Sequence, residues 1–123
     1  MKKLAVLWSL LALLVACAST PITAQSQHFG IMVAVSPSGI GVRPITITLT
    51  GSDKKPINDA SVTVFAVMKQ HGMLAVPLTL TPDAEGTYTS DVLDLNMAGE
   101  WQLQLHIVHG NVNDTLTIPV VVN

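Results

Sequence analysis

The 123-residue chain has a single cysteine, Cys17, and few aromatic or charged residues, which make up 4% and 11% of it. One thiol cannot form an internal disulfide, and it cannot supply the several thiolates of a structural zinc site. Six Lys and Arg against eight Asp and Glu give a formal net charge of −2, with no basic patch. These absences exclude a disulfide-stapled scaffold and argue against a nucleic-acid partner.

Motifs of common enzymes are missing too. The sequence contains no glycine-rich phosphate loop, no H-E-x-x-H zinc motif and no serine nucleophile at a strand–turn–helix. The aspartates lie mostly among turn residues, where aspartate is favoured for backbone reasons. We therefore expect a protein that is not an enzyme.

The longest apolar run stands at the N-terminus. It covers residues 4–16, follows Lys2 and Lys3, and is interrupted only by Ser9. It is too short for a transmembrane helix of ~20 residues, and it has the layout of a secretory signal. It runs into Cys17 as Leu-Val-Ala-Cys, which resembles the lipobox of bacterial lipoproteins. Residues 1–16 are therefore predicted to be a lipoprotein signal peptide, with Cys17 as the lipidated residue.

Cleavage after Ala24 is the alternative, because small residues also precede that point. Lipidation is favoured, since the only cysteine stands where the motif requires it. The mature chain is then expected to begin at Cys17 and to be anchored by lipid in the bacterial cell envelope, in the periplasm or on the outer surface. Without Lys2 and Lys3, four basic against eight acidic residues give a net charge of 4 − 8 = −4.

The rest of the chain reads as a short tether and one β-rich domain. Residues 17–27 are small and polar and are predicted to be flexible. Beyond them, short apolar or alternating stretches are separated by turn residues, as is typical of strands. The expected strands are 28–35, 40–50, 60–68, 74–80, 87–92, 100–108 and 115–122. This pattern predicts an all-β domain over residues 28–123, an immunoglobulin-like β-sandwich of about seven antiparallel strands. Trp101 is expected in its core, and Tyr88 at a strand start that resembles a tyrosine corner.

Two loops of this domain carry soft metal ligands. In such a sandwich the chain runs alternately up and down, so the loops after the third and fifth strands lie at the same end. The first loop holds His71 and Met73, directly after Met68, and the second holds Met97. Thioether sulfur selects Cu(I), and imidazole binds copper as well. The sequence therefore predicts a Cu(I) site made by His71, Met73 and Met97, with Met68 as a further candidate.

A packing role is the alternative for each of these residues. Met68 continues the inward face of its strand, and methionine fills gaps in small cores. Met97 could plug its loop, and His71-Gly72 could be an ordinary turn. Structural or solvated positions are expected for the remaining methionine and histidines of the domain: Met32, His28, His106 and His109.

Four motifs follow one another in order between residues 55 and 107. They are Pro56 to Val64, His71-Gly72-Met73, Gly86-Thr87-Tyr88, and Met97-Ala98-Gly99-Glu100-Trp101. This ordered set resembles the YtkA-like domain and the related FixH family. The resemblance implies an immunoglobulin-like fold and a link to copper handling or respiratory oxidase assembly. It also implies His71, Met73 and Met97 as the matching site residues. The FixH membrane helix has no counterpart here, which does not favour an oxidase-assembly role.

Two functions are therefore compatible with the sequence. The first is an envelope-anchored copper-binding protein that holds Cu(I) and delivers it to a copper-accepting partner protein. The second is a structural or protein-interaction β-sandwich lipoprotein that binds no metal.

Overall fold

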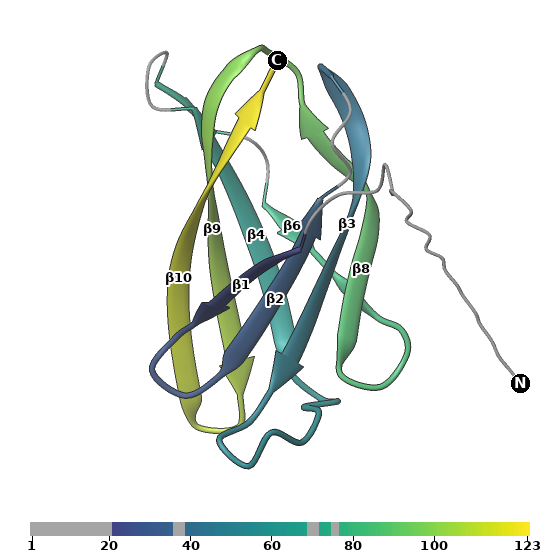
Figure 1. Ribbon diagram of the computed structural model, residues 1–123, viewed down its shortest axis with the longest axis vertical. Coiled ribbons are helices and arrows are strands. Elements are labelled where there is room, and N and C mark those ends of the chain that lie inside the picture. Colours follow the sequence, from purple (N-terminus) through teal and green to yellow (C-terminus); the bar gives the residue numbers. More distant parts are fainter. Residues whose placement is uncertain (1–20, 36–38, 69–71, 75–76) are drawn as a thin grey trace, which may run out of the picture.

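A computed structural model describes residues 21–35, 39–68, 72–74 and 77–123 (Figure 1). The predicted signal peptide, Cys17 and His71 lie outside these residues. The described strands are β1 (Ile22–Gln25), β2 (Gly30–Val35), β3 (Gly41–Thr50), β4 (Ser61–Met68), β5 (Met73–Leu74), β6 (Leu78–Thr79), β7 (Thr81–Pro82), β8 (Thr87–Leu95), β9 (Gly99–His109) and β10 (Val112–Val122). In this part of the chain there is no helix of a length and apolarity that would span a membrane.

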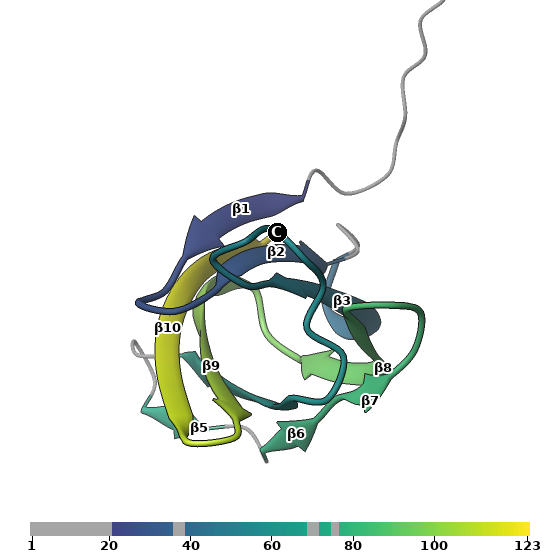
Figure 2. The same ribbon diagram turned by 90° about the horizontal axis from the view of Figure 1, so that it is seen from below.

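The strands form two antiparallel sheets packed face to face, as the end-on view shows (Figure 2). The first sheet has the order β1-β2-β3-β8-β7. The second has the order β10-β9-β4, and both β5 and β6 pair with the far side of β4. The predicted all-β sandwich is thus confirmed.

The expected strands are all present, with one of them broken. The stretch 74–80 is divided into β5 and β6, and Pro77 lies between them. Proline has no N–H for a ladder, so a break at the sheet edge is the expected result. Two short strands were missed, β1 and β7. Because Ile22–Gln25 pairs with β2 from Ile22↔Val33 to Gln25↔Gly30, the predicted flexible tether ends before β1.

Alternation along the strands builds the core. In β3 the inward residues Ile45, Ile47 and Leu49 have no exposed surface, while the threonines between them are partly exposed. In β9, Leu103, Leu105 and Ile107 are equally buried, and Trp101 is 2% exposed, so its predicted core position is confirmed. Burying an aliphatic or aromatic side chain of this size stabilises a fold by about 1.5–3 kcal/mol. The core residues that the structure describes fall between Phe29 and Val122.

Tyr88 makes the tyrosine-corner contact that its sequence position suggested. Its ring is 1% exposed, and its hydroxyl donates to the carbonyl oxygen of Ile57 at 2.7 Å. The Tyr88 hydroxyl oxygen in turn accepts a hydrogen bond from the N–H of Ala60 at 3.0 Å. These bonds hold the segment before β4 against β8, and so join the two sheets.

Candidate functional site

The end of β4 and the start of β5 lie at the same end of the sandwich as the loop between β8 and β9 (Figure 1). We call it the methionine end: β4 and β8 finish there, and β5 and β9 begin there. The opposite end, where β3 finishes and β9 turns into β10, is the base. The alternating-direction argument from the sequence therefore holds for the described strands.

Met68 is the last residue of β4, and none of its surface is exposed. It belongs to the hydrophobic core together with Trp101. The β4–β9 register reaches Val67↔Gln102, so the next step along both strands brings Met68 level with Trp101. This burial favours a packing role for Met68.

Met73 begins β5 and is the cross-strand partner of Met68. Residues that face each other across an antiparallel pair have Cβ atoms ~4.5–5.5 Å apart. Gly72 leads into this strand with φ of +61°, a left-handed conformation that glycine adopts at low cost. The pairing of β5 with β4 thus places the backbone of Met73 beside the end of β4.

Met97 lies in the loop between β8 and β9, and its side chain is partly buried against the core. Its carbonyl oxygen accepts a hydrogen bond from Nε1 of Trp101 at 3.0 Å. Because Trp101 is level with Met68, and Met68 pairs with Met73, the backbones of all three methionines converge on one corner of the methionine end. His71 falls between two of them in sequence.

Metal ligands of other kinds do not gather elsewhere. Among the described residues, no three His, Cys, Asp or Glu side chains come close enough to hold an ion together. Methionine is not one of those four residue types. A site made of methionine thioethers is therefore not covered by this statement.

The methionine end also carries the most exposed large apolar side chains of the described residues. Val42, Val92 and Val121 are 60%, 61% and 64% exposed, and Ile40 is 60% exposed. Ile40 comes just before β3, and Val42 is the second residue of that strand. Val92 is one of the last four residues of β8, and Val121 is next to the end of β10. Gly39 lies against the C-terminal residue, since a Cβ at Gly39 would be 3.6 Å from the carbonyl oxygen of Asn123. Val42 and Val92 belong to the first sheet and Val121 to the second, so both sheets carry exposed aliphatic side chains at this end.

Two acidic residues are cross-strand neighbours of these valines. Asp94 pairs with Val42 in the first sheet, and Glu100 pairs with Val121 in the second. Both acids are exposed. The methionine end therefore combines apolar contacts with negative charge.

The base carries a buried carboxylate that the sequence did not single out. Asp114 accepts hydrogen bonds from Ser26 Oγ at 2.6 Å and from the N–H of His28 at 2.7 Å. Its other oxygen lies 2.7 Å from His28 Nδ1, and its side chain is only 2% exposed. Burial alone would raise the pKa of Asp114, but the hydrogen bonds from Ser26 and His28 outweigh it and leave the pKa below its usual value of 3.8.

The other histidines keep the structural or solvated positions expected for them. His109 Nε2 lies 2.8 Å from Asp59 Oδ1, and its ring meets the edge of Phe29 at 6.3 Å. His106 faces outward from β9, and its ring centroid is 4.7 Å from that of Phe65.

The inward position of Asp114 could have been predicted from the sequence. The two-residue alternation of apolar residues at Ile118 and Leu116, extended by one more step, reaches position 114.

The fold is thus that of a small all-β sandwich with a soft-ligand corner at one end and a buried His–Asp pair at the other. A family comparison agrees with the motifs: the YtkA-like model matches residues 23–106, more than half of the chain. The chain belongs to the YtkA-like family. A search of curated proteins finds no match.

Proposed function

We propose that this YtkA-like domain binds Cu(I) at the methionine end and delivers it to an acceptor protein in the bacterial cell envelope, to which Cys17 anchors it by lipid. Met73, Met97 and His71 are the proposed ligands. The observation that carries the proposal is the convergence of the start of β5 and the β8–β9 loop, where the carbonyl oxygen of Met97 accepts a hydrogen bond from Trp101 Nε1 at 3.0 Å.

Thioethers suit an oxidising compartment. They need no deprotonation to bind, and they cannot be lost to a disulfide as thiols can. Met68 would serve as packing beneath the ligands, because it has no exposed surface. The role is binding and transfer without catalysis.

Delivery requires that a partner approach the ligands. The exposed aliphatic side chains around the methionine end, such as Val42 and Val121, support such an approach because they leave apolar surface open beside the loops. The nearby Asp94 and Glu100 would favour a partner with basic residues around its own contact.

The test is a Cu(I) competition titration with a colorimetric chelator. It uses the soluble form from Ser19 to Asn123, which includes the core residues that the structure describes. We expect one tight equivalent in this protein and its loss in the triple variant His71→Ala, Met73→Ala, Met97→Ala. Met32→Ala removes an exposed methionine far from the corner and is the matched control. Copper loading that is equal in the triple variant and in the control would refute the proposal.

Met68→Leu separates packing from coordination. Leucine conserves most of the volume, so a core methionine can be replaced at a cost below about 1.5 kcal/mol. We expect Met68→Leu to keep the copper equivalent. Its loss, with the fold intact by circular dichroism, would add Met68 to the ligands.

The second candidate function is a metal-free interaction module, favoured by the same exposed aliphatic side chains. In that case the titration shows no competition in any variant. Substitution of Val42 and Val121, but not of Met73 and Met97, would then abolish partner binding.

A further inference from the structure

Three cross-strand rows on the outer face of the first sheet consist of uncharged residues from four neighbouring strands. One cross-strand row is Thr23–Met32–Thr48–Thr87, the next is Gln25–Gly30–Thr50, and a third is Ala34–Thr46–Thr89. We call these ten residues the threonine face. The residues between them in sequence, such as Ile31, Val33 and Ile47, point into the core. No member of the three rows is charged, although the chain as a whole carries a net charge of −2.

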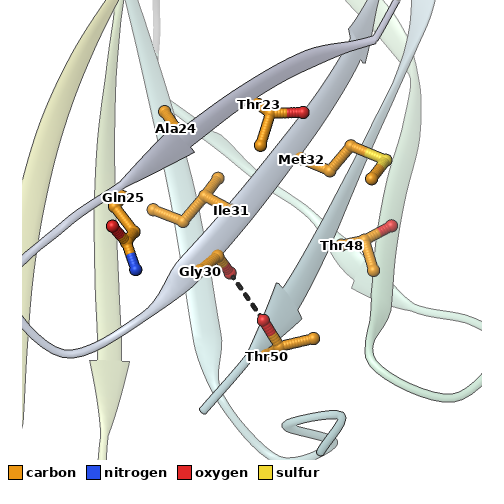
Figure 3. Close-up of a pocket in the computed structure, with 8 residues that line it drawn as sticks. All are labelled: Thr23, Ala24, Gln25, Gly30, Ile31, Met32, Thr48 and Thr50. Carbon is orange, nitrogen blue, oxygen red and sulfur yellow. Dashed lines mark hydrogen bonds between the residues drawn. The ribbon is translucent and has the colours of Figure 1, made fainter. Parts of the chain in front are cut away.

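A side chain and a hollow stand side by side at the centre of this face (Figure 3). Met32 projects from β2 and is 44% exposed. Met32 also forms part of the wall of a shallow hollow of about 390 Å³, which extends past Gln25, Gly30 and Thr50. Gly30 keeps the hollow open because a Cβ there would lie 2.6 Å from Thr50 Oγ1. A side chain at position 30 would therefore occupy this space only if the Thr50 side chain shifted.

The spacing of these two features makes the face complementary to itself. Met32 and Gly30 are two residues apart on one strand, which corresponds to about 7 Å. A two-fold axis that lies in the plane of contact above Ile31, perpendicular to the strand, exchanges the positions of Met32 and Gly30. It sets Met32 of one copy over Gly30 of the other, and the reverse. The sheets would then pack face to face at about 10 Å, as sheets do in sandwiches.

We propose that a second copy of this chain covers the threonine face, with each Met32 seated in the Gly30 hollow of its partner. The lack of charge on the face supports this occupant, because two acidic proteins can meet there without like charges in contact. Four strands about 4.8 Å apart and some six residues long give a plan area on the order of 400 Å². Standard interfaces bury about 800 Å² per partner, so we expect this dimer to be weak.

The test is sedimentation equilibrium of the metal-free soluble form from Ser19 to Asn123, at concentrations up to about 1 mM. Met32→Glu places a charge at the centre of the contact, and we expect it to weaken the dimer by at least about tenfold. Val108→Glu is the matched control. Val108 is 39% exposed on β9, a strand that is also flanked on both sides, but in the other sheet. This control should change the Kd by less than about twofold.

A charge-swap pair keeps the proposal testable if Met32→Glu alone has wider effects. Met32→Lys should also be monomeric, and an equimolar mixture of the Glu and Lys variants should recover a dimer. A wild-type protein that stays monomeric throughout the range overturns the proposal. So does a dimer that Met32→Glu leaves intact, or one that Val108→Glu abolishes equally. The outcome is independent of copper binding, since the methionine end is at a distance from this face and no metal is present.

Discussion

Replacing Asp114 by asparagine tests whether the base of the sandwich is held together by one buried carboxylate. Asp114 belongs to β10 of the second sheet, and its partners Ser26 and His28 belong to the connection between β1 and β2 of the first. The three contacts, at 2.6 to 2.7 Å, therefore bridge the two sheets on the side where β1 and β10 are edge strands. Asparagine keeps the shape but removes the charge.

The magnitude follows from the contacts that survive. A hydrogen bond to a charged group contributes about 1.5–3 kcal/mol, against about 0.5–1.5 kcal/mol for a neutral one. The Ser26 hydroxyl and the N–H of His28 donate to the same carboxylate oxygen, so an asparagine oxygen in that place can still accept from both, while the asparagine amide faces the His28 ring. The contact with the His28 ring weakens, but this ring is 47% exposed and its contribution is reduced by solvent. We therefore expect Asp114→Asn to lower the free energy of unfolding by about 2 kcal/mol at neutral pH.

The assay is urea unfolding followed by Trp101 fluorescence, with Asp59→Asn as the control. Asp59 also contacts a histidine, at 2.8 Å, but its side chain is 85% exposed. An exposed pair contributes little, so the control should change the free energy of unfolding by less than about 0.5 kcal/mol. Equal effects of the two substitutions would refute the reasoning that burial makes the Asp114 contacts strong.

The difference between wild type and Asp114→Asn also depends on pH. The folded-state pKa of Asp114 is below the unfolded value of 3.8, so the ionised carboxylate stabilises the fold. This contribution is fully present above the unfolded pKa and is lost as the pH falls through the lower, folded-state pKa. The difference in the free energy of unfolding between wild type and Asp114→Asn should therefore stay constant from neutral pH to about pH 5 and become smaller below about pH 4. A difference that does not become smaller would show that the charge of Asp114 is not its cause.

Two further substitutions test the fold. Tyr88→Phe removes both hydrogen bonds of the phenol hydroxyl and should lower the free energy of unfolding by about 1–3 kcal/mol, as measured in a thermal melt. An unchanged Tm would mean that the tyrosine corner does not contribute to stability. Gly86→Ala should destabilise by more than Gly72→Ala, by at least about 1 kcal/mol in urea unfolding. Both glycines have positive φ, +69° and +61°, but a Cβ at Gly86 would lie 2.7 Å from Pro56 Cβ, and one at Gly72 would meet nothing within 4 Å. Equal losses would mean that the contact with Pro56 relaxes without cost.

The sequence by itself determined the class of fold and the positions of most strands. Alternation in stretches such as Ile45 to Leu49 requires one buried and one exposed face, and that requirement depends only on the two-residue period of a strand. The up-and-down course of consecutive strands then placed Met73 and Met97 at the same end. The ordered motifs around Tyr88 and Trp101 were sufficient to predict the YtkA-like family.

Only the tertiary structure decided how distant parts of the chain meet. Ile22–Gln25 carries no strong strand pattern and becomes β1 because β2 offers it a free edge. In the sequence Asp114 stands among turn residues, whereas the structure places it in β10 beside His28, 86 positions away. The same holds for Met32 and Gly30, whose places on an uncharged face follow from pairing with β1 and β3. Local periodicity specifies which face of a strand is buried, but the neighbours of that face are chosen by the packing of the whole chain.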